Sequence, residues 1–99
     1  MNLIENHKNQ IISLCESHEV EKLYLFGSAT SDDFSANSDI DFLVKFKTID
    51  LKNYFINYYT LKQELKSLLK RKIDLLEEQT LKNPYLIQSI NKNKQLIYG

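Results

Sequence analysis

The stretch GSATSDDFSANSDID, residues 27–41, separates two apolar segments and holds almost no large apolar side chain before Ile40. The segment KLYLF before it, residues 22–26, has the length of a strand and stops at Gly27. The segment DIDFLVKF, residues 39–46, alternates polar and apolar side chains and predicts a second strand. Two strands joined through this polar stretch are therefore the starting point for the fold.

The rest of the chain predicts helices on both sides of these strands and one further strand. The expected elements are a helix over residues 2–18 with Asn2 as N-cap, a helix over 50–70 capped by Asp50, a strand over 72–76, and a helix over 84–94 with Pro84 in its first turn. The state of the apolar tail at residues 96–98 is left open. The order predicts an α+β fold, a small mixed sheet of three or four strands with helices packed on it, in one domain over residues 1–99.

The helix over residues 50–70 carries the strongest periodic pattern in the chain. Its apolar and aromatic side chains predict one buried stripe made of Leu51, Tyr54, Phe55, Tyr58, Leu61, Leu65, Leu68 and Leu69. Tyr59 falls outside this stripe and is expected to be exposed. A basic cluster, Lys66 with residues 70–72, follows near the end of the helix. Either a solvated helix end or a docking surface for a nucleotide or an acidic partner explains that cluster.

Composition excludes several classes of function. Basic and acidic residues number 13 each, so a net charge of zero gives no reason to expect direct binding to nucleic acid or to a membrane surface. The single cysteine, Cys15, excludes an internal disulfide and a cysteine metal cluster, and its apolar neighbours predict a buried thiol. His7 and His18 have no partners at metal-ligand spacing and are expected on the surface. Without a signal segment or a bilayer-length apolar run, a cytoplasmic protein is expected.

Asp39 and Asp41 are the first candidate functional pair. Residues two apart in a strand point the same way with Cα atoms roughly 6.5–7 Å apart, so two carboxylates would repel each other on one face. A divalent cation relieves this repulsion, and Mg²⁺ binds through carboxylates, waters and substrate phosphates. Gly27 allows a sharp turn and close approach of a phosphate, and Ser28 adds donors at what could be a short helix through residues 30–33. Two solvated acids and an ordinary turn are the plainer alternative.

Asp74 is the candidate third carboxylate. It lies between Ile73 and Leu75 in a short predicted strand and so faces away from both. If this strand pairs beside residues 39–46, Asp74 joins the other two acids, and three carboxylates can hold two metal ions for an in-line phosphoryl displacement. Without that pairing, Asp74 is only a polar residue on an edge strand.

The combination of Gly27-Ser28, a ten-residue spacer and Asp39-Ile40-Asp41 resembles the DNA-polymerase-beta-type nucleotidyltransferases. The short chain and the later Asp74 make it similar to the minimal nucleotidyltransferases, the MNT or MntA-like antitoxins of type VII-like toxin–antitoxin pairs. The resemblance implies an Mg²⁺-dependent enzyme that moves AMP from ATP to a tyrosine of a HEPN toxin encoded by the adjacent gene. The implied site residues are Gly27, Ser28 and Ser38 for the nucleotide, and Asp39, Asp41 and Asp74 for catalysis and for two Mg²⁺ ions.

One departure from the family pattern supports an alternative. Relatives often carry a basic residue shortly after Gly-Ser, whereas residues 29–33 read ATSDD here. The charge of the triphosphate would then be neutralised by Mg²⁺, by Lys70 or Lys72, or by the partner. The alternative is a weak or inactive module that neutralises the toxin by stoichiometric binding. Transfer to RNA or to a small molecule is disfavoured by the zero net charge and by the lack of a substrate domain.

Overall fold

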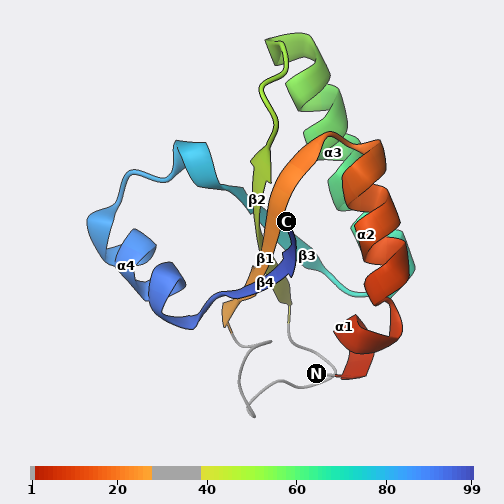
Figure 1. Ribbon diagram of the computed structural model, residues 1–99. Coiled ribbons are helices and arrows are strands. Elements are labelled where there is room, and N and C mark those ends of the chain that lie inside the picture. The colour runs from red at the N-terminus through yellow and green to blue at the C-terminus, as the bar shows by residue number, and fades with distance from the viewer. Residues whose placement is uncertain (1, 28–38) are drawn as a thin grey trace.

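A computed structural model describes residues 2–27 and 39–99 and contains a four-stranded mixed sheet with helices on both sides (Figure 1). The helices and strands, in chain order, are α1 (Asn2–Asn6), α2 (Lys8–Ser17), β1 (Val20–Phe26), β2 (Ile40–Phe46), α3 (Leu51–Leu69), β3 (Ile73–Glu77), the 3-10 helix η2 (Glu78–Thr80), α4 (Pro84–Asn93) and β4 (Gln95–Tyr98). The α+β fold expected from the sequence is confirmed.

The sheet has the strand order β3-β2-β1-β4. β1 pairs antiparallel with β2 and with β4, whereas β2 pairs parallel with β3. The apolar tail whose state the sequence left open is therefore β4, an edge strand. The parallel pairing of β2 with β3 follows from α3, which carries the chain back along the sheet between these two strands.

The sheet is covered on both faces. α2 and α3 pack against one face, and α4 lies on the other side (Figure 1). β2 is accordingly buried in both directions: Phe42 faces the main core, and Leu43 borders the hollow that Ile90 of α4 also lines. Cys15 is fully buried, as expected, and burial raises the pKa of its thiol to about 12.

The predicted helix over residues 2–18 is wrong in one respect, because it breaks at His7. The backbone of His7 leaves helical geometry at φ −115° and ψ 13°, and its Nδ1 donates to the carbonyl of Leu3 at 2.9 Å. A side chain that hydrogen-bonds the carbonyl four residues earlier competes with the backbone for it. Asn2 is the first residue of α1 rather than a cap before it. His7 and His18 are half-buried, not fully on the surface as predicted.

α3 confirms the predicted cap and only part of the predicted stripe. The Asn53 amide donates to Asp50 Oδ1 at 2.8 Å, which satisfies one of the free amides of the first turn. The later stripe residues Leu61 and Leu65 are fully buried. Leu51 and Phe55, however, are 70% and 61% exposed, so their predicted burial is wrong. The first turns of α3 lie beyond the arrow of β2 (Figure 1), and there Tyr54 packs on Phe46 while Leu51 and Phe55 stay exposed.

Two smaller predictions on the helices are confirmed. Tyr59 is 66% exposed, as expected for an aromatic side chain off the stripe. Pro84 is the first residue of α4, and Asn83 caps that helix by accepting from two backbone amides. Within residues 2–27 and 39–99, no helix combines the length and hydropathy that a bilayer-spanning segment needs.

Candidate functional site

The sheet brings the predicted acids together at one end. In the parallel pair, Asp41 of β2 lies opposite Asp74 of β3, and in the antiparallel pair Asp41 lies opposite Phe26 of β1. Side chains of directly opposed residues point to the same face of a sheet. Asp39 comes immediately before β2 and Gly27 immediately after β1. The sequence analysis expected Asp74 to join the other two acids if its strand paired beside residues 39–46. That pairing is present.

Gly27 packs its backbone against the Asp41 carboxylate. Its φ of +76° lies in the left-handed region that side chains disfavour. A Cβ built on Gly27 would overlap Asp41 Oδ2 and lie 3.2 Å from Asp41 Cγ. Both the backbone conformation and the lack of space therefore require glycine at this position. The sequence predicted that a phosphate would approach Gly27 closely. In the structure of the chain alone, the group that lies close to Gly27 is the Asp41 carboxylate.

Of the three acids, Asp41 is the one whose ionised form is clearly disfavoured. Its pKa is raised above the ordinary value, first by burial, then by the negative charge of Asp74 and then by that of Asp39. Both neighbouring acids thus lie close enough to disfavour the ionised form of Asp41. A cation between these carboxylates would offset both the repulsion and the loss of hydration.

These acids fit a metal that binds together with a substrate. Across the described residues, no three His, Cys, Asp or Glu side chains converge into a ready-made metal site. Mg²⁺ in phosphate-binding enzymes usually takes one or two carboxylates and completes its shell with waters and substrate oxygens. The paired carboxylates Asp41 and Asp74, with Asp39 beside them, offer that kind of donor set. Ser28, Ser38 and the predicted short helix at residues 30–33 lie outside the described part of the chain.

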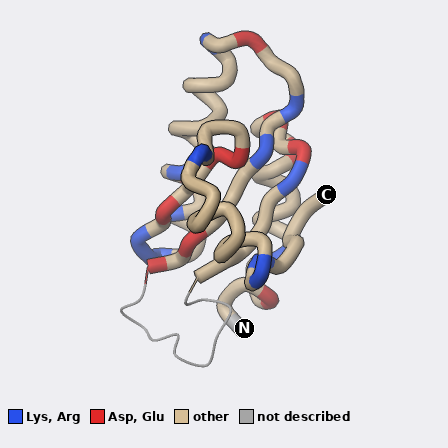
Figure 2. Tube along the Cα trace, turned by 90° about the vertical axis from the view of Figure 1, so that its left-hand side faces the viewer, with Lys and Arg blue, Asp and Glu red and all other residues tan. Residues whose placement is uncertain are grey.

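The basic cluster reaches the same end of the sheet. The Ile40 amide donates to the Lys72 carbonyl at 3.0 Å, which places Lys72 next to the start of β2 and hence to Asp39. Lys72 is exposed and precedes Asp74 by two residues, so an extended backbone directs both side chains to the same side. Figure 2 shows basic and acidic segments next to each other where the grey trace leaves the described chain. The backbone of a basic residue therefore lies beside the start of β2, whereas residues 29–33 supply no basic residue.

Tyr58 is a site neighbour that the sequence did not single out. Its hydroxyl donates to the carbonyl of Leu75 at 2.5 Å and so ties α3 to β3 directly after Asp74. The pKa of Tyr58 is raised by burial and then by the Asp74 charge. The sequence placed Tyr58 in the buried stripe of α3. The Tyr58 hydroxyl within an apolar stripe indicated that a hydrogen-bond partner was needed. That this partner is the Leu75 carbonyl depends on tertiary structure, which the sequence does not give.

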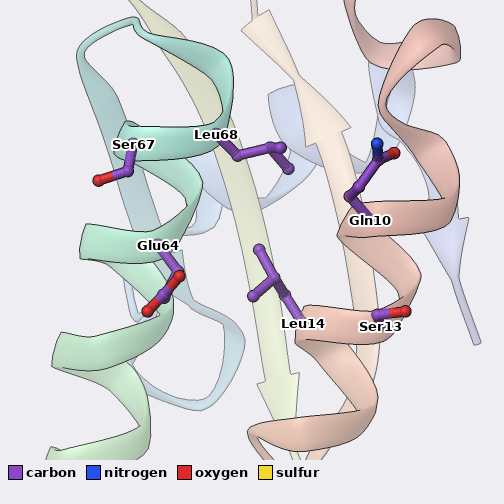
Figure 3. A pocket seen from close by; sticks show the side chains of 6 residues that line it. All are labelled: Gln10, Ser13, Leu14, Glu64, Ser67 and Leu68. Atoms are coloured by element: carbon purple, nitrogen blue, oxygen red, sulfur yellow. The ribbon is translucent and has the colours of Figure 1, made fainter.

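Two hollows lie elsewhere on the molecule. One, of about 460 Å³, separates α2 from α3; there Leu14 and Leu68 point toward each other while Ser13 and Ser67 point away (Figure 3). The other, of about 580 Å³, lies between the start of α3 and the segment after β3. Its lining consists of Ile49, Leu51, Tyr54, Phe55, Glu77, Gln79 and Thr80. Neither hollow is lined by Gly27 or by the three acids.

Comparison with known proteins shows which family the chain is similar to. The family model described as polymerase beta nucleotidyltransferase matches residues 9–99. A curated relative from Methanocaldococcus jannaschii, named "Putative protein adenylyltransferase MJ0128", is 34% identical over 97 residues, which cover 97% of this chain and 90% of the relative.

Solved structures of toxin–antitoxin proteins have the same fold. A toxin–antitoxin structure with AMP-PNP matches with a TM-score of 0.73 and 29% identity, over 93% of this chain and 73% of that chain. A complex of a tri-AMPylated HEPN toxin with an MNT antitoxin from Shewanella oneidensis matches with a TM-score of 0.67 and 26% identity. That match covers 96% of this chain and 71% of the other.

Proposed function

The chain belongs to the polymerase-beta nucleotidyltransferase family, and on that basis we propose that it transfers AMP from ATP to a tyrosine hydroxyl of a partner protein. The partner we propose is a HEPN-type toxin encoded by the adjacent gene, so that the chain acts as its antitoxin in the cytoplasm. The toxin–antitoxin complexes that share the fold support this partner. The observation that carries the proposal is the pairing of Asp41 with Asp74 beside the left-handed Gly27.

The reaction assigns a task to each residue at the end of the sheet. Asp39, Asp41 and Asp74 would hold Mg²⁺, two ions when ATP is bound, and the metal supplies positive charge to the reacting phosphate. The turn at Gly27-Ser28 and Ser38 would bind the triphosphate, and Lys72, directly before β3, would add positive charge.

The transfer itself exchanges one phosphorus–oxygen bond for another. The tyrosine oxygen of the partner attacks the α-phosphorus, and the bond from the α-phosphorus to the β-phosphate oxygen breaks. In this proposal Asp74 takes the hydroxyl proton, and pyrophosphate leaves with the electron pair of the broken bond. Asp74 is exposed while Asp41 is half-buried, so of these two Asp74 is the carboxylate that a protein acceptor reaches more readily.

The alternative is an inactive module that neutralises the toxin by binding alone. The acidic, Arg-free segment at residues 29–33 favours it. The position of Lys72 opposes it, because the Lys72 backbone lies beside the start of β2 and its side chain would supply the missing positive charge. A vestigial site would also have no reason to retain the crowded contact between Gly27 and the Asp41 carboxylate.

A labelling experiment separates the two functions. The protein, its genomic neighbour, Mg²⁺ and labelled ATP are incubated together, and the incubation is repeated with Asp39→Ala/Asp41→Ala. We expect label on the neighbour with the wild type, none with the double variant, and full labelling with the control Glu64→Ala, which removes an exposed acid of α3. Neutralisation of the toxin that survives the double variant, without any label, would establish the inactive module instead.

A further inference from the structure

The first half of α3 carries four large apolar side chains that contact no core. Leu51, Phe55, Ile56 and Tyr59 are 70%, 61%, 55% and 66% exposed. Leu51, Phe55 and Tyr59 are four residues apart and so form one stripe, with Ile56 next to it. We name these four residues the α3 apolar face. Contiguous exposed apolar surface on a small protein is typical of an interaction site.

The hollow of about 580 Å³ borders this face and contains a buried acid. Leu51 and Phe55 belong both to the face and to the lining of the hollow, and Glu77 is the only charged residue in that lining within the described chain. Glu77 is 5% exposed. One of its oxygens, Oε2, accepts from the Thr80 amide at 3.1 Å, but within the described chain Oε1 has no hydrogen-bond partner. A buried acceptor left without a donor is costly, so a donor supplied from outside would be favoured.

The lining of the hollow indicates which donor fits. Among the residues that the structure describes, no Lys or Arg lines it, and Lys45, whose charge lowers the pKa of Glu77, forms an ion pair with Glu21 at 3.1 Å. Two of the walls are the aromatic rings of Tyr54 and Phe55, which pack edge to face with their centroids 5.5 Å apart. A guanidinium stacks on aromatic rings and donates to a carboxylate at the same time. Burial already raises the pKa of Glu77, which a cation would reverse.

We propose that the α3 apolar face and the Glu77 hollow form a docking surface for a partner protein that inserts an arginine flanked by apolar side chains. The inference rests on the proposed function in taking this partner to be the acceptor protein. A second copy of this chain is a poorer occupant, because its one arginine, Arg71, lies half-buried beside the acids at the far end of α3.

The strand β3 sets the distance between the docking surface and the acids. Glu77 lies three residues after Asp74 in β3, about 10 Å along the strand at roughly 3.3 Å per residue. Tyr58, three residues after Phe55 in α3, bonds the Leu75 carbonyl directly after Asp74. A partner docked on the α3 apolar face must therefore extend about 10 Å along β3 to present its acceptor hydroxyl to the acids. Binding and catalysis then depend on separate residues.

Affinity measurements on the purified full chain test this surface. The adjacent-gene protein is titrated calorimetrically into the wild type, Phe55→Ser, Glu77→Gln and the control Tyr85→Ser, whose side chain is 82% exposed on α4. We expect the dissociation constant to rise about tenfold or more for the first two variants and to stay unchanged for the control. AMP transfer at saturating partner should be unchanged in Phe55→Ser, since that residue belongs to the docking surface and not to the residues proposed to hold the metal or the nucleotide. Thermal melts establish that each variant is folded.

Equal affinity of all four proteins would overturn the docking surface and leave the proposed enzyme intact. If the neighbour neither binds nor is labelled with the wild type, the proposed function fails, and a peptide probe tests the surface alone. Acetyl-Leu-Arg-Leu-amide and acetyl-Leu-Glu-Leu-amide are titrated against the amide NMR spectrum. Shifts at Phe55 and Thr80 with the arginine peptide only, lost in Glu77→Gln, support the surface. Equal responses to both peptides, or no response, overturn it.

Discussion

Gly27 and Asp41 form the tightest contact of the site, and the clash at position 27 makes it testable. In Gly27→Ala, the new methyl group meets the Asp41 carboxylate, and a φ of +76° is unfavourable for alanine. We expect a loss of about 1–3 kcal/mol in the free energy of unfolding, measured by urea denaturation, together with loss of AMP transfer.

The double variant Gly27→Ala/Asp41→Ala separates the steric overlap with the Asp41 carboxylate from the backbone strain at position 27. Removing the carboxylate removes the overlap and leaves only the backbone strain. The double variant should therefore be more stable than Gly27→Ala alone, although it remains inactive. Strictly additive stability losses in the two single variants would show that the two residues do not touch.

The Asp41 carboxyl makes the stability of the metal-free protein depend on pH. Its pKa in the folded chain is raised by burial, by Asp74 and by Asp39, so folding favours the protonated form. Its favourable contribution is thus present below the ordinary value of 3.8 and is lost as the pH rises through the folded pKa. Asp41→Asn should accordingly be more stable than the wild type at about pH 7 without metal, and the gain should shrink near pH 4. Urea midpoints at both pH values measure it.

Mg²⁺ should make the wild type more stable than Asp41→Asn, which reverses the order of stability expected without metal. A ligand that binds only the folded state stabilises it, so Mg²⁺ with AMP-PNP should raise the melting temperature of the wild type. Asp41→Asn lacks one of the proposed metal ligands and should respond less. The readout is thermal unfolding with and without a chelator and requires no turnover. A wild type that is unaffected by Mg²⁺ and nucleotide would contradict the assignment of the metal ligands.

The contact between α3 and β3 decides how firmly Asp74 is held. In Tyr58→Phe the Leu75 carbonyl loses its donor at 2.5 Å, and a half-buried carbonyl left unpaired costs about 1–3 kcal/mol. We expect that loss in the free energy of unfolding and a slower AMP transfer, because Leu75 follows Asp74 directly. Tyr85→Phe is the control, since Tyr85 is 82% exposed on α4 and lies outside both the acids and the α3 apolar face. Equal effects of the two variants would show that Tyr58 does not position β3.

Elements with a strong local signal were predictable from sequence, and those set by long-range contacts were not. The α3 cap at Asp50 and the start of α4 at Pro84 depend on neighbouring residues only, and both are confirmed. The break at His7 depends on a side chain that bonds a carbonyl one turn earlier, which helical periodicity does not register. The state of β4 depends on the free edge of β1, which lies about seventy residues earlier in the chain.

The candidate site was predictable as a list of residues but only partly as an arrangement. Alternation within β2 and β3 gave the direction of Asp41 and Asp74, because side chains in a strand alternate by geometry. Their pairing required a parallel register, which no local pattern determines. The exposure of Leu51 and Phe55 was missed for a related reason. Periodicity shows which residues share one face of a helix, but it cannot show where the sheet beneath the helix ends.

The balance of charge over the molecule makes nucleotide binding depend on placement rather than on total charge. With 13 basic and 13 acidic residues, the chain as a whole does not attract a polyphosphate. Local placement can do so, because the hydrogen bond from the Ile40 amide to the Lys72 carbonyl holds the backbone of a basic residue beside the start of β2. If Lys72 contacts a phosphate, its loss removes a charge-assisted hydrogen bond worth about 1.5–3 kcal/mol.

Lys72→Ala should therefore weaken binding of AMP-PNP by roughly tenfold to a hundredfold, measured by calorimetric titration with Mg²⁺ at fixed ionic strength. Lys52→Ala is the control, since Lys52 is exposed in the first turn of α3 and the same unit of charge is lost there. The two variants have the same net charge, so any difference between them measures position alone. Equal weakening in both would mean that nucleotide binding follows net charge, and normal affinity in Lys72→Ala would assign the phosphate contact to another residue.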